Sequence, residues 1–314
     1  MDERSTNRQA DVDWDGFFDG ASRPMTEMPT VAWQIQAELG EGPVWVERDR
    51  ALWFVDIKQQ LIHRYDPASG SRDSWRSPEQ VGFIFPARDG GFVIGLQSGL
   101  HRFDERNGQF SLIVEVEPQL PNNRLNDGVV DPAGRLWFGT MDNGEKAKTG
   151  AFYCFHQGQL TRTALDGIAI TNGPAVSPDG QLLYFVDTLR GTIGVADIQD
   201  DGSLGSPRPF VRIDHREGHP DGPTIDSAGH LWVSLYGGWE ARRYTPYGEL
   251  VDTVRFPAAN ITKLALGGPD LRTAYATTAR QLLSPEEIEK QPLIGSLFEF
   301  GVNVPGVPCP LVSA

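Results

Sequence analysis

Three polar residues each stand directly before a glycine, at the start of a short apolar run. They are Glu41 in "EGPVWVE", Asn172 in "NGPAVSP" and Asp221 in "DGPTIDS". If the fold buried them together, the two carboxylates would repel each other and one would be protonated, unless a cation removed the conflict. An all-oxygen ligand set suits a hard divalent cation such as Ca²⁺, Mg²⁺ or Mn²⁺. Water and substrate would complete the coordination, which leaves the open positions that a catalytic metal needs.

A second interpretation treats the same residues as turn residues, because Asp and Asn before Gly are common in turns that hold no metal. That interpretation is weaker for Glu41, since Glu is not a favoured turn residue. Arg124 and Asn126 in "NNRLNDG" lie two residues apart, so in an extended segment both side chains point the same way. The guanidinium fork of Arg124 could hold substrate oxygens. An arginine on a surface loop is the alternative.

An internal repeat supplies the strands that would bring these residues together. Each copy is a polar turn followed by a β-branched and aromatic run, as in "DPAGRLWFGTM" and "DSAGHLWVSLY". The runs recur at intervals of 40 to 48 residues around six anchors: Trp53, Val93, Trp137, Tyr184, Trp232 and Tyr275. A period in the forties with several strands per unit is typical of propeller blades. We therefore predict an all-β, six-bladed β-propeller over residues 29–314. A β-sandwich or a solenoid is the alternative.

A second strand precedes each of these turns. In a propeller the first strand of each blade lines the central channel, and the chain enters these inner strands on one face of the ring. We call the first residue of each such run its entry position; the six are Glu41, Val81, Asp127, Asn172, Asp221 and Thr262. These side chains should converge around the axis although they are far apart in sequence. Asn126 would replace Asp127 after a shift of one residue.

Composition restricts the partners and the location. The net charge of −14 argues against nucleic acid and anionic membranes as partners. No apolar run approaches the roughly 20 residues of a membrane span. Residues 1–28 are expected to be an extension before the propeller, and their acidic start lacks the apolar core of a signal peptide. Two cysteines cannot build a disulfide framework, so we expect free thiols and a cytoplasmic protein.

Other hydrolytic chemistry finds little support in the sequence. The segment "GLQSG" at 95–99 lacks the spacing of a serine nucleophile elbow. The six histidines include no pair at metal-ligand spacing, and no histidine or cysteine occupies an entry position. A structural zinc site is therefore not expected.

Five segments, in order, resemble the successive motifs of the senescence-marker-protein (regucalcin), gluconolactonase and luciferin-regenerating-enzyme family. They are "LGEGPVWVERDRALWFVDI", "NRLNDGVVDPAGRLWFGTM", "NGPAVSPDGQLLYFVDT", "GHPDGPTIDSAGHLWV" and "LALGGPDLRTAYATTA", within residues 33–302. The resemblance implies a six-bladed propeller with one divalent cation in its central channel. Ca²⁺ is the first expectation, with Mg²⁺, Mn²⁺, Zn²⁺ or Fe²⁺ as alternatives. The implied reaction is the metal-dependent hydrolysis of aldono-1,4- or 1,5-lactones, such as gluconolactone, to aldonic acids.

The resemblance also implies roles for single residues. Glu41, Asn172 and Asp221 match the family's metal ligands, and Asp221 matches the proposed general base that activates water. Arg124 and Asn126 match residues that contact substrate, so Asn126 takes the place that the repeat alone had given to its neighbour.

We expect Asp142, just after the third repeat's aromatic run, to add a further substrate contact. Lys263 in "ITKLALGG" departs from the family pattern and would place a cation near the pocket wall. Two other functions remain open. One is a phosphotriesterase-like hydrolase on the same scaffold, and the other is a non-catalytic calcium-binding propeller. The expected partner is a small sugar lactone, and the expected state is a monomer or a weak homo-oligomer.

Overall fold

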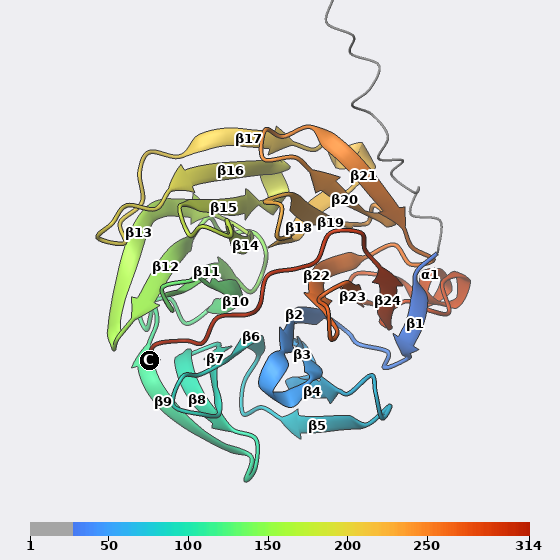
Figure 1. Cartoon of the computed structure of the whole chain (residues 1–314), viewed down its shortest axis with the longest axis horizontal. Helices are drawn as coiled ribbons and strands as arrows, with labels where there is room; N and C mark the ends of the chain where they lie inside the picture. Colours follow the sequence, from blue (N-terminus) through green and yellow to red (C-terminus); the bar gives the residue numbers. More distant parts are fainter. Residues whose placement is uncertain (1–27) are drawn as a thin grey trace, which may run out of the picture.

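The computed structural model describes residues 28–314, which form 24 strands, one short α-helix and three 3-10 turns. The strands are arranged as sheets around a central axis, with one strand of each group next to that axis (Figure 1). The all-β propeller predicted from the repeat is therefore confirmed. The extension expected for residues 1–28 lies almost wholly outside the described residues. Within residues 28–314, no helix is long and apolar enough to cross a membrane.

Four of the sheets have four strands each, in chain order from the axis outwards. The first contains β2 (Gly40–Val46), β3 (Ala51–Asp56), β4 (Leu61–Tyr65) and β5 (Arg72–Arg76). The second contains β6 (Val81–Pro86), β7 (Phe92–Leu96), β8 (Gly99–Asp104) and β9 (Gln109–Glu115). The third contains β10 (Asn123–Val130), β11 (Leu136–Asp142), β12 (Gly150–His156) and β13 (Gln159–Ile168). The fourth contains β14 (Thr171–Val176), β15 (Leu182–Asp187), β16 (Thr192–Asp197) and β17 (Arg208–Arg212).

The fifth sheet has eight strands and corrects the prediction of six separate blades. One half contains β18 (His219–Ile225), β19 (Leu231–Tyr236), β20 (Glu240–Tyr244) and β21 (Leu250–Arg255). The other half contains β22 (Ile261–Gly267), β23 (Thr273–Thr278), β24 (Leu297–Gly301) and β1 (Thr30–Trp33), and α1 (Pro285–Lys290) lies between β23 and β24. The halves are continuous because Gly222 in β18 pairs in parallel with Lys263 in β22. The count is thus four separate four-stranded sheets and one eight-stranded sheet.

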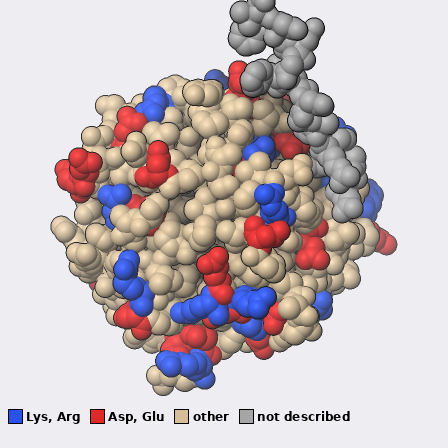
Figure 2. All heavy atoms as spheres, in the orientation of Figure 1, with Lys and Arg blue, Asp and Glu red and all other residues tan. Residues whose placement is uncertain are grey.

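The inner strands have mostly apolar sequences because they are buried. The strands β2, β6, β14 and β22 are buried along their whole length, whereas β5 is mostly exposed. The aromatic anchors Trp53, Trp137, Tyr184 and Tyr275 are fully buried in the second strands. Charged side chains of both signs are interspersed on the face seen in Figure 2. The apolar periodicity therefore marks a core between sheets that packs each blade against its neighbours.

Glycines allow the inner strands to approach each other closely. A Cβ atom at Gly82 would lie 2.5 Å from the carbonyl oxygen of Asn126 in the neighbouring inner strand. A Cβ atom at Gly222 would lie 2.6 Å from Cβ and Cγ of Lys263. Neither position leaves space for a side chain, so the glycines after the entry positions permit a narrow channel.

The two ends of the chain close the ring and cover one face of it. The N-terminal strand β1 pairs with β24, so one sheet combines both ends of the propeller. Residues 302–314 then run across the middle of the ring (Figure 1). They bond to the turns that follow inner strands: Ser227 N–H donates to Pro305 O over 2.9 Å, and Ser313 N–H donates to Gly134 O over 2.9 Å. This segment therefore lies at the end of the channel away from the entry positions.

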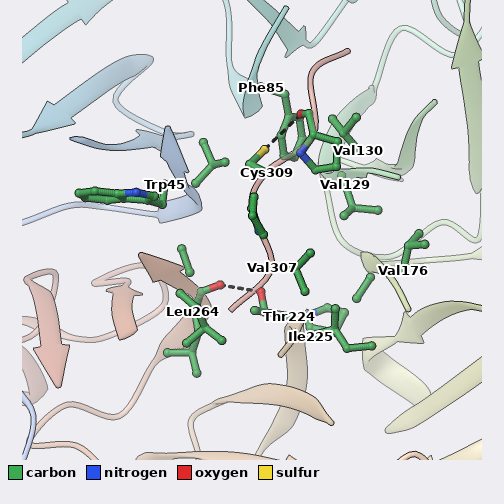
Figure 3. Close-up of a pocket in the computed structure, with 18 of the residues that line it drawn as sticks. Trp45, Phe85, Val129, Val130, Val176, Thr224, Ile225, Leu264, Val307 and Cys309 are labelled. Atoms are coloured by element: carbon green, nitrogen blue, oxygen red, sulfur yellow. Dashed lines mark hydrogen bonds between the residues drawn. The ribbon is translucent and has the colours of Figure 1, made fainter. Parts of the chain in front are cut away.

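An apolar cavity of about 130 Å³, here called the rear cavity, lies between the inner strands and this C-terminal segment. Its lining includes Trp45, Leu264, Val129 and Val307, and Cys309 lies beside Phe85 (Figure 3). The channel is thus mainly apolar at this end, with Lys263 among the polar exceptions.

Buried aspartates organise the repeated turns. The Asp131 carboxylate is fully buried and accepts the backbone N–H groups of Ala133 and Arg135, at 2.9 and 3.0 Å. It also accepts Nε1 of Trp137 at 2.9 Å and Nε of Arg135 at 2.5 Å. This one side chain ties the turn to the aromatic anchor of the next strand, which explains the "DPAGRLW" pattern.

Replacing Asp131 with alanine should lower the free energy of unfolding by about 3 kcal/mol, because it leaves buried donors and an arginine without their partner. Asp201→Ala is the control, since Asp201 is exposed and also accepts a turn N–H, that of Ser203. Urea unfolding followed by tryptophan fluorescence would measure both. Equal effects of the two substitutions would show that the buried aspartate has no special role.

Candidate functional site

Five of the six predicted site residues meet in one pocket of about 360 Å³, here called the candidate pocket. They come from four inner strands: Glu41 from β2, Arg124 and Asn126 from β10, Asn172 from β14 and Asp221 from β18. Each is at most 5% exposed. The repeat thus brings together residues that are up to 180 positions apart in the chain.

The rest of the lining combines apolar side chains with a few polar groups. The apolar part includes Leu39, Met141, Ile170, Leu189 and Leu282. The polar part includes Glu145, Thr188, His219, Tyr236 and Gln281. A pocket with an apolar wall and a few convergent polar groups is the usual form of a small-molecule site.

Glu41 and Asp221 form a buried pair of acids. Each carboxylate accepts the N–H of the glycine that follows it, with Gly42 N 2.9 Å from Glu41 Oε2 and Gly222 N 2.9 Å from Asp221 Oδ1. Burial, with the charge of Asp127, raises the pKa of Glu41 to about 8. Burial, with the charges of Glu41 and Asp127, raises the pKa of Asp221 well above its usual range. Negative charge in this pocket therefore needs compensation.

A hydrogen-bond network orients the amide groups. Asn126 Nδ2 donates to Asn172 Oδ1 over 3.0 Å and to Thr171 O over 2.6 Å. Asn172 Nδ2 donates to Thr188 Oγ1 over 2.9 Å, and Thr188 Oγ1 in turn donates to Pro220 O over 3.0 Å. These bonds fix which end of each amide is the oxygen, so the Asn172 carbonyl and not its NH₂ group is turned toward Asn126.

Arg124 is a buried cation with spare donors. Its Nη1 donates to Asn126 Oδ1 over 2.6 Å and to Leu125 O over 3.2 Å. Its Nε is buried and has no partner within residues 28–314. Burial lowers the pKa of Arg124 to about 10, so it is charged at neutral pH. An unpartnered donor in a buried pocket could bind a substrate oxygen.

Asp127, the residue that the repeat register had selected, does not line the candidate pocket. Its Oδ1 accepts Lys263 Nζ over 2.6 Å and its Oδ2 accepts Gly173 N–H over 3.0 Å. The pairing of β10 with β11 is irregular between Leu125 and Gly128. A bulge places two residues, Asn126 and Asp127, opposite one, and of these two Asn126 lines the pocket. The family match to Asn126 was therefore the better guide.

Asp142, which we expected from the sequence to contact substrate, does not line the candidate pocket. Its Oδ2 accepts the N–H groups of Lys146 and Ala147, at 3.1 and 2.9 Å, and so it shapes the loop after β11. That loop places Glu145 in the pocket lining, where Gln281 Nε2 donates to Glu145 Oε1 over 2.9 Å. Sequence reasoning missed Glu145 and Gln281, because their meeting depends on loop contacts between residues 136 positions apart.

The oxygen atoms of the pocket suit a hard divalent cation. Within residues 28–314, no three His, Cys, Asp or Glu side chains are grouped as a metal site. The pocket instead offers two carboxylates and an amide carbonyl, which are the ligands of a hard cation. Burial and neighbouring carboxylates raise the pKa of both Glu41 and Asp221, and a divalent cation would offset that repulsion. Glu41, Asn172 and Asp221 could therefore hold such an ion.

Residues 39–280 match the family described as the SMP-30/Gluconolactonase/LRE-like region. The chain is 34% identical over 276 residues to the 6-deoxy-6-sulfogluconolactonase of Pseudomonas putida, covering 87% of this chain and 94% of that one. It is 38% identical over 264 residues to the L-arabinolactonase of Azospirillum brasilense, covering 83% and 87%.

Two solved structures have the same fold over nearly the whole described chain. A calcium-binding regucalcin from Agrobacterium tumefaciens superimposes with a TM-score of 0.87 at 30% identity, covering 91% of this chain and 97% of that one. A luciferin-regenerating enzyme superimposes with a TM-score of 0.85 at 30% identity, covering 91% and 100%. The ordered motifs, the propeller and these matches agree, and the chain belongs to the SMP-30/gluconolactonase/LRE-like family.

Proposed function

We propose that this protein hydrolyses a sugar lactone to the open-chain aldonic acid, with a divalent cation bound in the candidate pocket. The observation that carries the proposal is the meeting of two buried carboxylates, an amide carbonyl and a buried arginine from four inner strands. Two relatives are named as sugar lactonases, which supports the same substrate class here.

The architecture that we propose is a single propeller of six blades over residues 29–314. The two halves of the eight-stranded sheet are joined by the single parallel pair of Gly222 and Lys263. Counting each half as one blade gives every entry position a blade of its own.

Glu41, Asn172 and Asp221 would hold the cation, which when bound would polarise the lactone carbonyl as a Lewis acid. Arg124 would donate to ring hydroxyls or to the carbonyl oxygen, using the Nε that has no partner within residues 28–314. Asn126 holds the Arg124 guanidinium with its oxygen and Asn172 with its nitrogen. Asn126 would thus hold the Arg124 guanidinium and the Asn172 amide in fixed positions relative to each other. The apolar wall would exclude bulk water from the rest of the pocket.

Asp221 would take a proton from the attacking water as a general base. Its buried environment raises its pKa and so favours proton uptake. Coordination of a carboxylate to a cation opposes this, because the cation lowers the pKa. The alternative role for Asp221 is to orient the water while the cation makes it acidic.

The proposal can be tested with a panel of aldonolactones at neutral pH, by following acid release with and without a chelator. Turnover that stops on chelation and returns with added metal supports the lactonase. Turnover of phosphotriesters alone would indicate the other hydrolase, and calcium binding without any turnover would indicate a binding propeller. The regucalcin similarity makes Ca²⁺ the first metal to add.

Asp221→Asn should reduce kcat for the best lactone by about 100-fold or more, because a carboxamide cannot accept the proton. The change keeps the size of the side chain, so circular dichroism should stay unchanged. Asp200→Asn, at an exposed residue, is the matched control. Full activity in metal-loaded Asp221→Asn would exclude Asp221 as the base.

Glu41→Gln should weaken Ca²⁺ binding by about tenfold or more, because affinity follows the charge of the oxygen ligands. Isothermal titration calorimetry on chelator-treated protein would measure it. Glu286→Gln in α1 removes an exposed carboxylate as the control. An unchanged titration curve would remove Glu41 from the ligand set.

A further inference from the structure

A buried ion pair spans the channel between the candidate pocket and the rear cavity. Lys263 Nζ in β22 donates to Asp127 Oδ1 in β10 over 2.6 Å and to Gly128 O over 3.2 Å. The strands β10 and β22 lie on opposite sides of the axis (Figure 1). Lys263 lines the rear cavity, and Asn126, next to Asp127, lines the candidate pocket. The pair therefore lies where the two cavities approach each other.

The fold makes room for this lysine. The stem of Lys263 packs against Gly222, where a Cβ atom would lie 2.6 Å from Cγ and 2.8 Å from Cδ of the lysine. Gly222 directly follows Asp221. Lys263 therefore crosses the channel along Gly222, next to the proposed cation ligand Asp221.

Lys263 supplies one positive charge to a channel that contains three buried carboxylates. Three buried carboxylates, those of Glu41, Asp127 and Asp221, act on one another electrostatically. Of the three carboxylates, Lys263 bonds only to that of Asp127, yet its stem lies along Gly222, the residue after Asp221, and its charge lowers the pKa of both Glu41 and Asp221. It is therefore close enough to act on the pair that would hold the cation, although it does not line their pocket.

We propose that Lys263 is a built-in counter-charge of the cation site. It neutralises Asp127 and partly offsets Glu41 and Asp221, so the channel tolerates three buried acids without a metal and holds a divalent cation less tightly than its carboxylates alone would. The second part rests on the proposed function, because it requires the cation to bind at Glu41 and Asp221. Lys263 is a positioning residue here, since it acts through charge and through Asp127.

The pair also positions a proposed ligand. The Asp127 carboxylate that Lys263 holds accepts Gly173 N–H with its other oxygen, and Gly173 directly follows Asn172. Gly173 has φ +75°, a conformation that suits glycine and that this bond helps to fix. The lysine thus connects to Asn172 through one carboxylate and one backbone bond.

Lys263→Met tests the proposal, because methionine retains much of the apolar stem and removes the charge. In chelator-treated protein at pH 8, the thermal midpoint should fall by about 5 °C or more, since Asp127 loses its partner. Ca²⁺ should bind about tenfold tighter or better by calorimetry, because a positive charge near the site is gone. Added Ca²⁺ should raise the midpoint by more than it does in wild type.

Two further variants separate charge from packing. Asp127→Asn keeps Lys263 but removes its carboxylate, so Ca²⁺ binding should become weaker by about tenfold. The double variant Asp127→Asn/Lys263→Met removes both charges and should return close to wild-type affinity. Lys290→Met, at an exposed lysine of α1, controls for the loss of one positive charge and should change neither quantity.

The test does not depend on Lys263→Met alone. If that variant does not fold, the Ca²⁺ affinity of Asp127→Asn can still be compared with that of the double variant, which should bind Ca²⁺ more tightly. Tighter binding in Lys263→Met supports the proposal, including the case in which wild type binds no Ca²⁺ and the variant does. Equal or weaker binding in Lys263→Met, with wild-type binding intact, overturns it and leaves the proposed function standing. Absence of Ca²⁺ binding in every protein overturns both.

Discussion

Repulsion between buried carboxylates is the constraint on which the channel of this propeller depends. Glu41, Asp127 and Asp221 approach the axis from three different inner strands, and each is at most 5% exposed. Water cannot screen them there, so each negative charge needs a partner or a proton. Among residues 28–314, one of the three has a direct ion-pair partner: Lys263 bonds to Asp127. The other two share a pocket with Arg124, whose guanidinium is bonded to Asn126.

The glycine after each acid allows the three carboxylates to lie close together. Glycine follows all three, and its N–H donates to the preceding carboxylate in each case, at 2.7 to 2.9 Å. The same glycines leave no Cβ atom between inner strands, so Lys263 can lie along Gly222. Irregular pairing at these points, as between Glu41 and Val44 or between Asn172 and Ala175, turns the polar side chains toward the pocket. One short motif thus supplies the charge, its local hydrogen bond and the space.

The features that could be predicted from the sequence are those that repeat along the chain. Burial of the aromatic anchors repeats with each four-stranded unit, so the spacing of Trp53 and its counterparts predicts the propeller and the convergence of Glu41, Asn172 and Asp221. The repeat alignment selected the residue before the glycine, Asp127, but in the irregular part of β10 Asn126 is the residue that lines the pocket. The joining of two blades through Gly222 and Lys263 has no periodic signal, and neither does the loop that turns Asp142 away and Glu145 inward. Those outcomes depend on contacts between distant segments.

The acids of the channel differ in how completely their oxygens are bonded. Asp127 has the bonds expected of a structural residue, because Lys263, Gly128 and Gly173 together satisfy both of its oxygens. Glu41 and Asp221 have strongly raised pKa values, and Arg124 beside them keeps a buried Nε without a partner in the part of the chain that the structure describes. A fold selected for stability alone would replace such groups with apolar ones, since unpaired buried polar atoms destabilise. Their presence at the open end of the channel, while the opposite end is mainly apolar and crossed by residues 302–314, is the arrangement expected when a ligand completes the site.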